Sequence, residues 1–167
     1  MDTYGFAPRW QSFAPYFLST LRIVAAFLFI QYGTAKLFAY PASIIPGGGT
    51  APMMSQAWFA SWMELLGGAL LFVGLFTRPI AFLVSGEMAF AYFIGHAPQG
   101  FWPVLNQGVP AILFCFFWLY ISAAGAGPWS IDALLARPRP SKADAAWTRE
   151  KVDRRAVADR RQYRKAG

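Results

Sequence analysis

The chain has 167 residues, enough for one domain, and 56% of them are hydrophobic, which is more than a soluble globular domain usually contains. The net charge of +7 comes from residues 137–167, which hold 11 Lys and Arg against 4 Asp and Glu, whereas residues 1–136 hold 4 of each sign. With one cysteine and one histidine, the chain alone cannot build an internal disulfide, a structural zinc site or a bis-histidine haem site.

The first apolar run starts near Phe17 and follows residues 1–16, which we expect to be a cytoplasmic segment. It is predicted to be a retained transmembrane helix rather than a secretory signal. No basic segment precedes it, it is too long for a signal-peptide core, and it lacks a small-x-small cleavage site.

Four apolar runs are close to the 17–25 residues that a membrane-spanning helix needs. They are residues 17–39, 57–76, 79–95 and 104–124. The two-residue link Thr77-Arg78 forces the second and third runs to be antiparallel neighbours, and Pro79 suits a helix start. Pro110 is expected to kink the fourth run or to mark a re-entrant start. The sequence therefore predicts an all-α membrane protein, a four-transmembrane-helix antiparallel bundle within residues 17–135.

The distribution of Lys and Arg predicts the orientation in the membrane. The links at residues 41–56 and 96–103 contain neither residue, whereas Arg9, Arg78 and the tail at residues 136–167 would lie on the other side. We expect a multi-pass protein of a bacterial-type cytoplasmic (inner) membrane with both termini in the cytoplasm. The basic tail, with a modest helix from Ala143, is expected to bind anionic lipid in the bilayer rather than nucleic acid.

Two glutamates, Glu64 and Glu87, lie in the middle of apolar runs. A carboxylate at such depth costs several kcal/mol unless it is paired, protonated or hydrated. From a helix rise of about 1.5 Å per residue, Glu64 would lie roughly 10 Å and Glu87 roughly 12 Å below the outer membrane edge. Lys36 is the only basic side chain in reach, so we expect it to pair with one glutamate. The other would be protonated or bonded to Gln31, Tyr32 or Tyr92.

Polar side chains from all four predicted helices fall in the outer half of the membrane. The candidates for ligand binding or proton relay are Gln31, Lys36, Glu64, Glu87, His96, Asn106 and Gln107. Two carboxylates in one site repel each other, so proton exchange at this pair is chemically available. Three structural readings stay open: an ion pair that only fixes helix register, a Lys36 that extends to the interface, and a His96 that is simply an interfacial residue.

The chain resembles the DoxX family of small four-helix membrane proteins over about residues 18–135. The resemblance is carried by residues 33–38 (GTAKLF), 64–68 (ELLGG), 74–79 (GLFTRP), 86–89 (GEMA), 96–103 (HAPQGFWP) and 127–132 (GPWSID). It implies a four-helix bundle in the cytoplasmic membrane. It also implies an association with quinone- or thiol-linked redox systems, because the family shares its name and fold with subunits of sulfur-compound:quinone oxidoreductases.

Three functions fit these features, and whether the protein is an enzyme stays open. The first is a membrane subunit or partner of a redox complex, with a quinone as the candidate cofactor between the helices. No cysteine pair or dinucleotide glycine motif is present, so electrons would come from a protein partner or from the quinone. The second is a small proton-coupled transporter, which would need to form a homo-oligomer. The third is a scaffold or assembly factor without catalytic activity.

Overall fold

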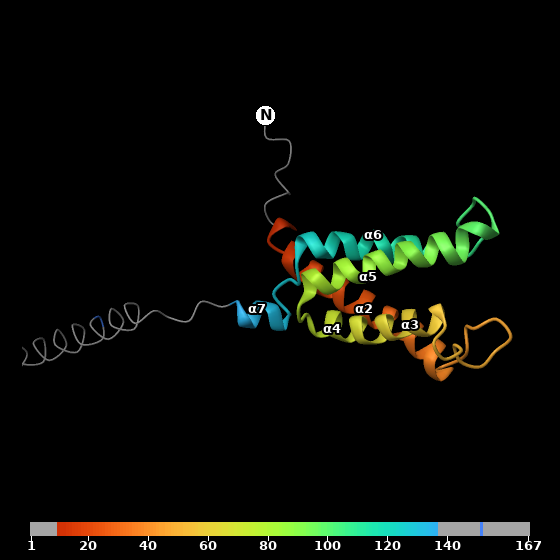
Figure 1. Ribbon diagram of the computed structural model, residues 1–167. Helices are drawn as coiled ribbons and strands as arrows, with labels where there is room; N and C mark the ends of the chain where they lie inside the picture. The colour runs from red at the N-terminus through yellow and green to blue at the C-terminus, as the bar shows by residue number, and fades with distance from the viewer. Residues whose placement is uncertain (1–9, 137–150, 152–167) are drawn as a thin grey trace, which may run out of the picture. The chain divides into compact units, whose positions relative to one another are not determined.

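The computed structural model describes residues 10–136 and Lys151, and every regular element among them is helical (Figure 1). The chain separates into two units, residues 1–135 and residues 136–167. The helices discussed below belong to the first unit. The helix predicted from Ala143 and most of the basic tail lie outside the described residues, as does most of the predicted N-terminal segment.

Four long helical stretches lie side by side, and consecutive stretches run in opposite directions (Figure 1). The first is α2 (Ala14–Phe38), with a proline in its first turn. The second joins α3 (Gln56–Trp62), the π-helical turn η1 (Met63–Gly67) and α4 (Gly68–Val73). The third joins α5 (Thr77–Ala91), the π-helical turn η2 (Tyr92–His96) and the 3₁₀ turn η3 (Ala97–Gln99). The fourth is α6 (Val109–Ala124), which the short helix α7 (Ile131–Leu135) follows.

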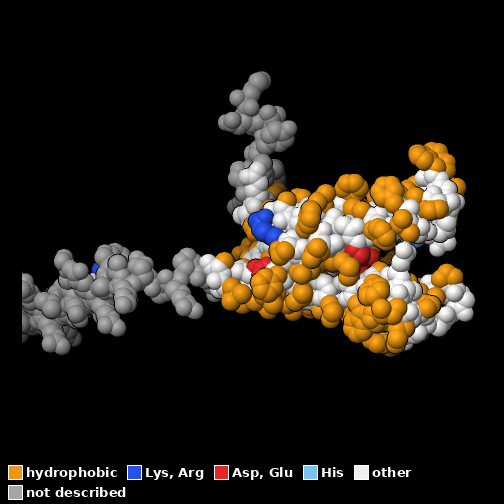
Figure 2. Space-filling view, in the orientation of Figure 1, with side chains coloured by type: hydrophobic (Ala, Val, Ile, Leu, Met, Phe, Trp, Pro, Cys, Tyr) orange, Lys and Arg blue, Asp and Glu red, His pale blue; other side chains and the backbone are white. Residues whose placement is uncertain are grey.

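The lengths and composition of these stretches confirm the predicted fold class. Three of them are long and apolar enough to cross a membrane, namely Ala14–Phe38, Gln56–Val73 and Thr77–Gln99, and the fourth is a shorter apolar helix. Hydrophobic side chains cover most of the visible face of the helical unit (Figure 2). In lipid, such a face needs no further cover, so the protein is an all-α membrane bundle.

The fourth helix begins later than predicted, at Val109 rather than Val104. Residues 103–107 form a turn in which the side-chain oxygen of Asn106 accepts the N–H of Gly108 at 2.9 Å. Pro110 lies in the first turn of α6, where its missing N–H removes no helical hydrogen bond. It therefore starts the helix instead of kinking it.

The link between the second and third stretches also differs from the prediction. It lies at residues 74–76 rather than at Thr77-Arg78, and it uses left-handed backbone at Gly74 (φ 70°) and Phe76 (φ 50°). The third stretch continues to Gln99, so His96 lies on a helical turn and not in the loop. The added π and 3₁₀ turns carry the chain past the point at which the hydrophobic pattern ends.

Close packing holds the four stretches together around an apolar centre. The buried cluster at this centre comprises Ala26, Phe29, Leu71, Ala81, Val84, Met88, Trp118 and Ile121. In lipid, the hydrophobic effect adds little to the association of helices, so how closely the helices pack determines how strongly they associate. At Gly33, an added Cβ would lie 2.8 Å from both the carbonyl oxygen of Ser61 and the nitrogen of Leu65. Only glycine lets α2 approach the second stretch this closely.

At one end of the bundle, which we call the Arg22 end, Arg22 connects α2 to α4 and to the loop before α7. Its side chain is 0% exposed and donates hydrogen bonds to the carbonyl of Phe72 at 2.8 Å, of Ala126 at 2.9 Å and of Trp129 at 2.6 Å, and also to that of Leu71. The carbonyl groups of Leu71 and Phe72 belong to the end of α4, and those of Ala126 and Trp129 belong to the loop before α7. A cation at carbonyl groups that have no helical partner is the favourable arrangement at a helix C-terminus.

Asp132 caps the neighbouring helix start at the same end. Its carboxylate accepts the N–H groups of Phe76 at 2.9 Å and of Thr77 at 2.8 Å, at the beginning of α5. Burial acts to raise the pKa of Asp132, but the hydrogen bonds from Thr77 and Phe76 and the charge of Arg22 outweigh it, so the pKa lies below its ordinary value. Arg78 at the start of α5 likewise donates to the carbonyls of Ser122 and Ala123, so these three charged side chains at this end have structural partners.

Candidate functional site

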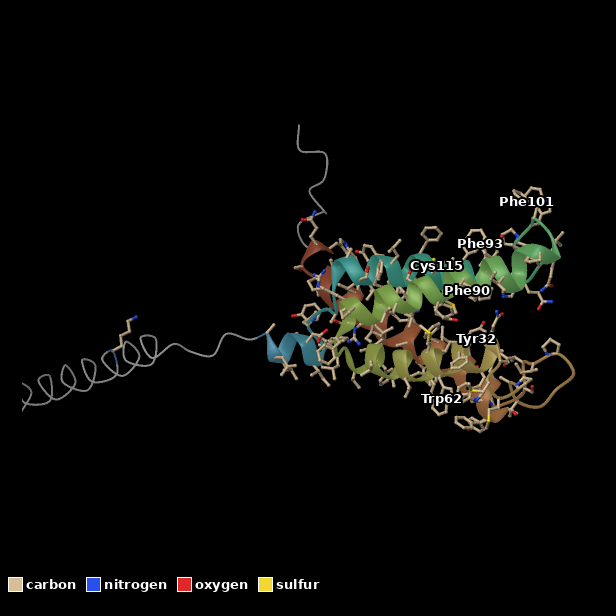
Figure 3. All side chains as sticks on the ribbon, viewed as in Figure 1. Tyr32, Trp62, Phe90, Phe93, Phe101 and Cys115 are labelled. Carbon is tan, nitrogen blue, oxygen red and sulfur yellow. The ribbon has the colours of Figure 1, made fainter. Side chains whose placement is uncertain are left out.

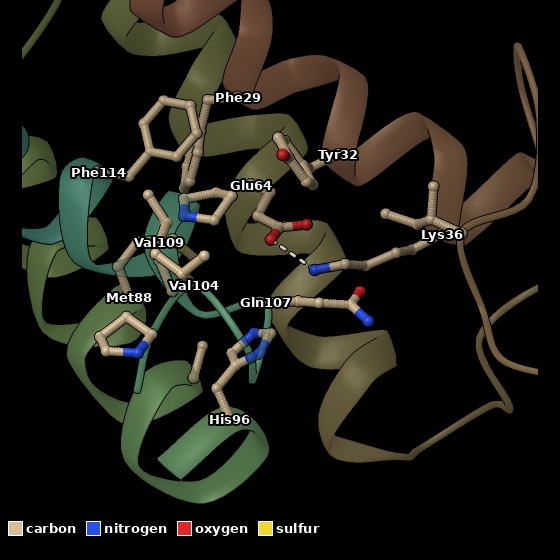
Figure 4. A pocket seen from close by; sticks show the side chains of 15 residues that line it. Phe29, Tyr32, Lys36, Glu64, Met88, His96, Val104, Gln107, Val109 and Phe114 are labelled. Carbon is tan, nitrogen blue, oxygen red and sulfur yellow. Dashed lines mark hydrogen bonds and ion pairs between the residues drawn. The ribbon is translucent and has the colours of Figure 1, made fainter. Parts of the chain in front are cut away.

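An ion pair lies at the opposite end of the bundle, which we call the Lys36 end. The Nζ atom of Lys36 on α2 is 2.6 Å from Oε1 of Glu64 in η1 (Figure 4). The Glu64 side chain is 2% exposed and that of Lys36 is 20% exposed. The predicted pairing of Lys36 with one glutamate is therefore present, and the glutamate is Glu64.

The local backbone explains why these two side chains meet. The close approach at Gly33 brings α2 against the backbone of Ser61 and Leu65, on either side of Glu64. Lys36 follows Gly33 by about one helical turn and so lies at the level of this contact. Glu64 itself lies in the π-helical turn η1, a feature that is common at functional sites in helices.

The ion pair faces a cavity of about 580 Å³, which we call the central chamber. Its polar lining comes from Lys36, Glu64, His96 and Gln107 (Figure 4). Its apolar lining includes Phe29, Tyr32, Met88, Val104, Val109 and Phe114. The rings of Tyr32 and Phe114 meet edge to face with centroids 6.0 Å apart. A few polar groups in an aromatic and aliphatic wall are typical of a small-molecule site.

Glu87 lies on the other side of Lys36, in a second cavity of about 460 Å³ between α3 and α5, which we call the lateral cavity. Lys36 and His96 line both cavities. Oε2 of Glu87 is buried and has no hydrogen-bond partner among the described residues, as is also true of Oε2 of Glu64. Glu87 nevertheless lies within electrostatic range of Glu64 and Lys36. The three charged groups therefore form one cluster.

His96 is held by the turn before α6. Its Nδ1 lies 2.9 Å from the backbone oxygen of Asn106. A carbonyl oxygen only accepts, so Nδ1 carries the proton when the ring is neutral, and Nε2 is then an acceptor. Because His96 lines both cavities, it can offer this acceptor to a bound molecule.

Two predicted site residues line neither cavity. Asn106 is 2% exposed and braces the turn before α6, donating to the carbonyl of Gly100 at 2.7 Å. Gln31 accepts a hydrogen bond from Thr34 through its backbone carbonyl. The expected hydrogen bond from Gln31, Tyr32 or Tyr92 to the second glutamate is not formed at Oε2 of Glu87. Tyr32 lines the central chamber instead.

The sequence did not point to the aromatic wall or to the π-helical turns. Phe29 and Phe114 read as ordinary apolar positions, and no residue pattern marks a π turn in a hydrophobic run. Arg22 gave a usable signal, because a basic residue inside an apolar helix needs partners as much as a glutamate does. Its partners could not be predicted, because two of the four carbonyl groups, those of Ala126 and Trp129, lie in the loop before α7.

The charged cluster offers an ammonium donor and two carboxyl groups to the two cavities, and His96 adds an imidazole. These groups can bind a head group that both donates and accepts hydrogen bonds, and they can exchange protons with it. Among residues 10–136 and Lys151, no three His, Cys, Asp or Glu side chains come together in a group that could hold a metal ion.

Comparison with known proteins identifies the family of the chain. The family model for DoxX matches residues 17–97, which include Lys36, Glu64, Glu87 and His96. An uncharacterized protein of Haemophilus influenzae is 43% identical over 127 residues, which cover 73% of this chain and 92% of that protein. No solved structure matches the chain. The four apolar helices, the family match and this relative together establish that the chain belongs to the DoxX family.

Proposed function

We propose that the protein is a membrane subunit or partner of a quinone- or thiol-linked redox complex and that it binds the head group of a quinone in the central chamber. The observation that carries the proposal is the ion pair of Lys36 and Glu64, which faces a cavity of about 580 Å³ inside a membrane bundle. A quinone carbonyl would accept a hydrogen bond from Lys36, and the aromatic wall would contact the ring. The family's link to quinone-dependent oxidoreductases supports the same choice.

The chamber suits an amphipathic ligand better than a soluble one. Its walls are largely apolar, and its polar groups are those of Lys36, Glu64, His96 and Gln107 and the hydroxyl of Tyr32. A free ionic substrate would lose its hydration without enough partners to replace it. In this proposal the electrons come from a protein partner, and the bundle supplies binding, orientation and proton exchange.

Orientation in a bacterial-type inner membrane is part of the proposal. The Arg22 end would face the cytoplasm, together with both termini, and the Lys36 end would face outward. The absence of Lys and Arg from residues 41–56 and 96–103 supports this orientation. The basic tail would then bind anionic lipid of the inner leaflet, at about 1 kcal/mol per basic residue near the surface. Homo-oligomerisation is compatible with this arrangement.

Purification from native membranes tests the ligand. We expect quinone to co-purify with the wild type. The amount bound should fall about tenfold in Glu64→Gln, because the ion pair that holds Lys36 at the chamber is lost. Gln31→Leu is the matched control, since it removes a membrane polar side chain that lines neither cavity. Thermal unfolding of each variant checks the fold. The proposal is overturned if neither quinone nor a redox partner co-purifies with the wild type. It is also overturned if Glu64→Gln retains as much quinone as the wild type.

Labelling in intact cells tests the orientation. In a Cys115→Ala background, we expect a membrane-impermeant maleimide to label Gly48→Cys, in the glycine-rich loop at the Lys36 end, and to miss Leu134→Cys until the cells are opened. The physical reason is the charge bias that retains Lys- and Arg-rich segments in the cytoplasm. The reverse labelling pattern would show that the bundle is inverted.

A further inference from the structure

The lateral cavity continues beyond Glu87 into an apolar groove. It shares Phe59 and Met63 with a further hollow of about 340 Å³ between the second stretch and α5. The other walls of this hollow include Trp62, Leu66, Leu70, Ile80, Leu83 and Val84. We call the two hollows together the lateral groove. From Gln56 at its polar end to Leu70 at its apolar end, the helix rise gives a length of roughly 20 Å.

The polar end of the groove offers acceptors that have no donor. Lys36 is engaged by Glu64, so Glu87 has no cation as its own hydrogen-bond partner, and its buried Oε2 has no partner among the described residues. Nε2 of His96 is a second acceptor when Nδ1 donates to Asn106. A buried acceptor without a donor, such as Oε2 of Glu87, is costly, so a head group that presents hydroxyl groups to Glu87 and His96 fits this end better than one with two carbonyl groups.

The apolar end lies open to lipid. Leu66 of the second stretch and Leu83 of α5 both line the groove, and each is 57% exposed. Trp62 and Phe90 mark the two helices that border the groove, as Figure 3 shows. A hydrocarbon chain there would contact both helices along their length. A phospholipid is a poor occupant, because its anionic phosphate would face the Glu87 carboxyl group and lie far below the headgroup layer.

We propose that the lateral groove binds a lipid hydroquinone in its reduced form, with the hydroxyl groups at Glu87 and His96 and the apolar tail along Phe59, Met63, Leu66 and Leu83. This inference rests on the proposed function and adds to it the path of the tail and the redox form that this side prefers. Lys36, in the wall between the two cavities, would separate a carbonyl-binding side from a hydroxyl-binding side. Binding alone is proposed, and no electron transfer is assigned to the groove.

Photo-labelling of the full chain in lipid nanodiscs tests the path of the tail. The probe is decylubiquinone with a diazirine on its tail, reduced before use, and decylubiquinol is the competitor. In the wild type we expect the probe to label the groove residues. In Leu83→Trp and in Leu66→Trp we expect decylubiquinol to compete with the probe at least about tenfold more weakly, because the larger ring fills the groove. Leu113→Trp is the matched control, since Leu113 is 65% exposed on α6 and lines none of these cavities.

Glu87→Gln tests the preference for the reduced form. The amide keeps the size of the side chain but replaces one carboxyl oxygen with an NH₂ donor, so we expect the preference for decylubiquinol over decylubiquinone to fall about tenfold. The ratio of the two competition curves measures this preference and does not depend on how much protein is folded. An unchanged ratio would overturn the placement of the head group at Glu87.

The results also separate this inference from the proposed function. If Leu83→Trp competes like Leu113→Trp while Glu64→Gln loses quinone, the groove assignment is wrong and the central chamber remains the binding site. If the wild type takes up no probe in either redox form, both proposals are overturned. Labels confined to Tyr32 and Phe114 would likewise place the tail in the central chamber and overturn the groove.

Discussion

Two carboxyl groups and one ammonium group share the Lys36 end, and Lys36 is bonded to only one of the carboxyl groups. Burying the Glu87 carboxyl group at this depth without a partner costs free energy. An ion pair that only fixed helix register would need Lys36 and Glu64 but not Glu87. Glu64 is explained by its contact with Lys36. The proposed hydroquinone would donate a hydrogen bond to Glu87, which is the physical basis of the proposal for the lateral groove.

The Arg22 end shows the opposite case, in which each charged side chain has backbone partners. We expect Asp132→Asn to lower the stability of the detergent-solubilised protein at pH 7 by about 0.5–1.5 kcal/mol, because the amide keeps only one of the two oxygens that accept the N–H groups of Phe76 and Thr77. Thermal unfolding followed by tryptophan fluorescence measures this change.

The pH dependence follows from the direction of the Asp132 pKa. Because that pKa is lowered in the folded state, the stability it gives is present above the unfolded value of about 3.9 and is lost as the pH falls through the folded value. The wild type should therefore lose its advantage over Asp132→Asn as the pH falls below about 4. A difference that stays constant as the pH falls would mean that the charge of Asp132 contributes nothing.

At the scale of the elements, the site depends on how closely α2 approaches the second stretch. Gly33 allows the approach, and the π-helical turn η1 presents Glu64 to Lys36. His96 lies in the other π-helical turn, η2, so both unusual turns of the bundle hold a residue of the charged cluster or its cavities. Hydrophobic patterning places such residues at a depth in the membrane but does not indicate the turn type.

Gly33→Ala tests this approach. An added methyl group would lie 2.8 Å from backbone atoms of Ser61 and Leu65, which cannot rotate away, so we expect a loss of about 1–3 kcal/mol in stability. Gly86→Ala is the control, because its Cβ would meet nothing within 4 Å. Thermal unfolding of the two variants gives the comparison. Equal stability would show that α2 and the second stretch are not packed at Gly33.

At the scale of the whole molecule, the two ends of the bundle are built differently. Charged side chains cap helix ends around Arg22, whereas the Lys36 end holds two cavities around a charged cluster. One end is thus fixed by hydrogen bonds, and the other keeps space for a ligand.

Much of this arrangement could be predicted, because lipid imposes strong rules on the chain. Apolar run length predicts the helices, and the scarcity of charge inside them makes Lys36 and Glu64 conspicuous. The start of α6 was mispredicted because Val104 and Leu105 are as apolar as a helix core, and only the cap formed by Asn106 ends the turn there. Helix contacts such as that at Gly33 are tertiary and have no local pattern.

A density map of the particle isolated from native membranes tests the central claim most directly. We predict that Lys36 and Glu64 remain paired, that Glu87 faces the same region, and that density for a ring-shaped head group lies against this cluster. The contrary result would be a map in which Glu64 and Glu87 point apart into acyl chains or in which side chains close both cavities.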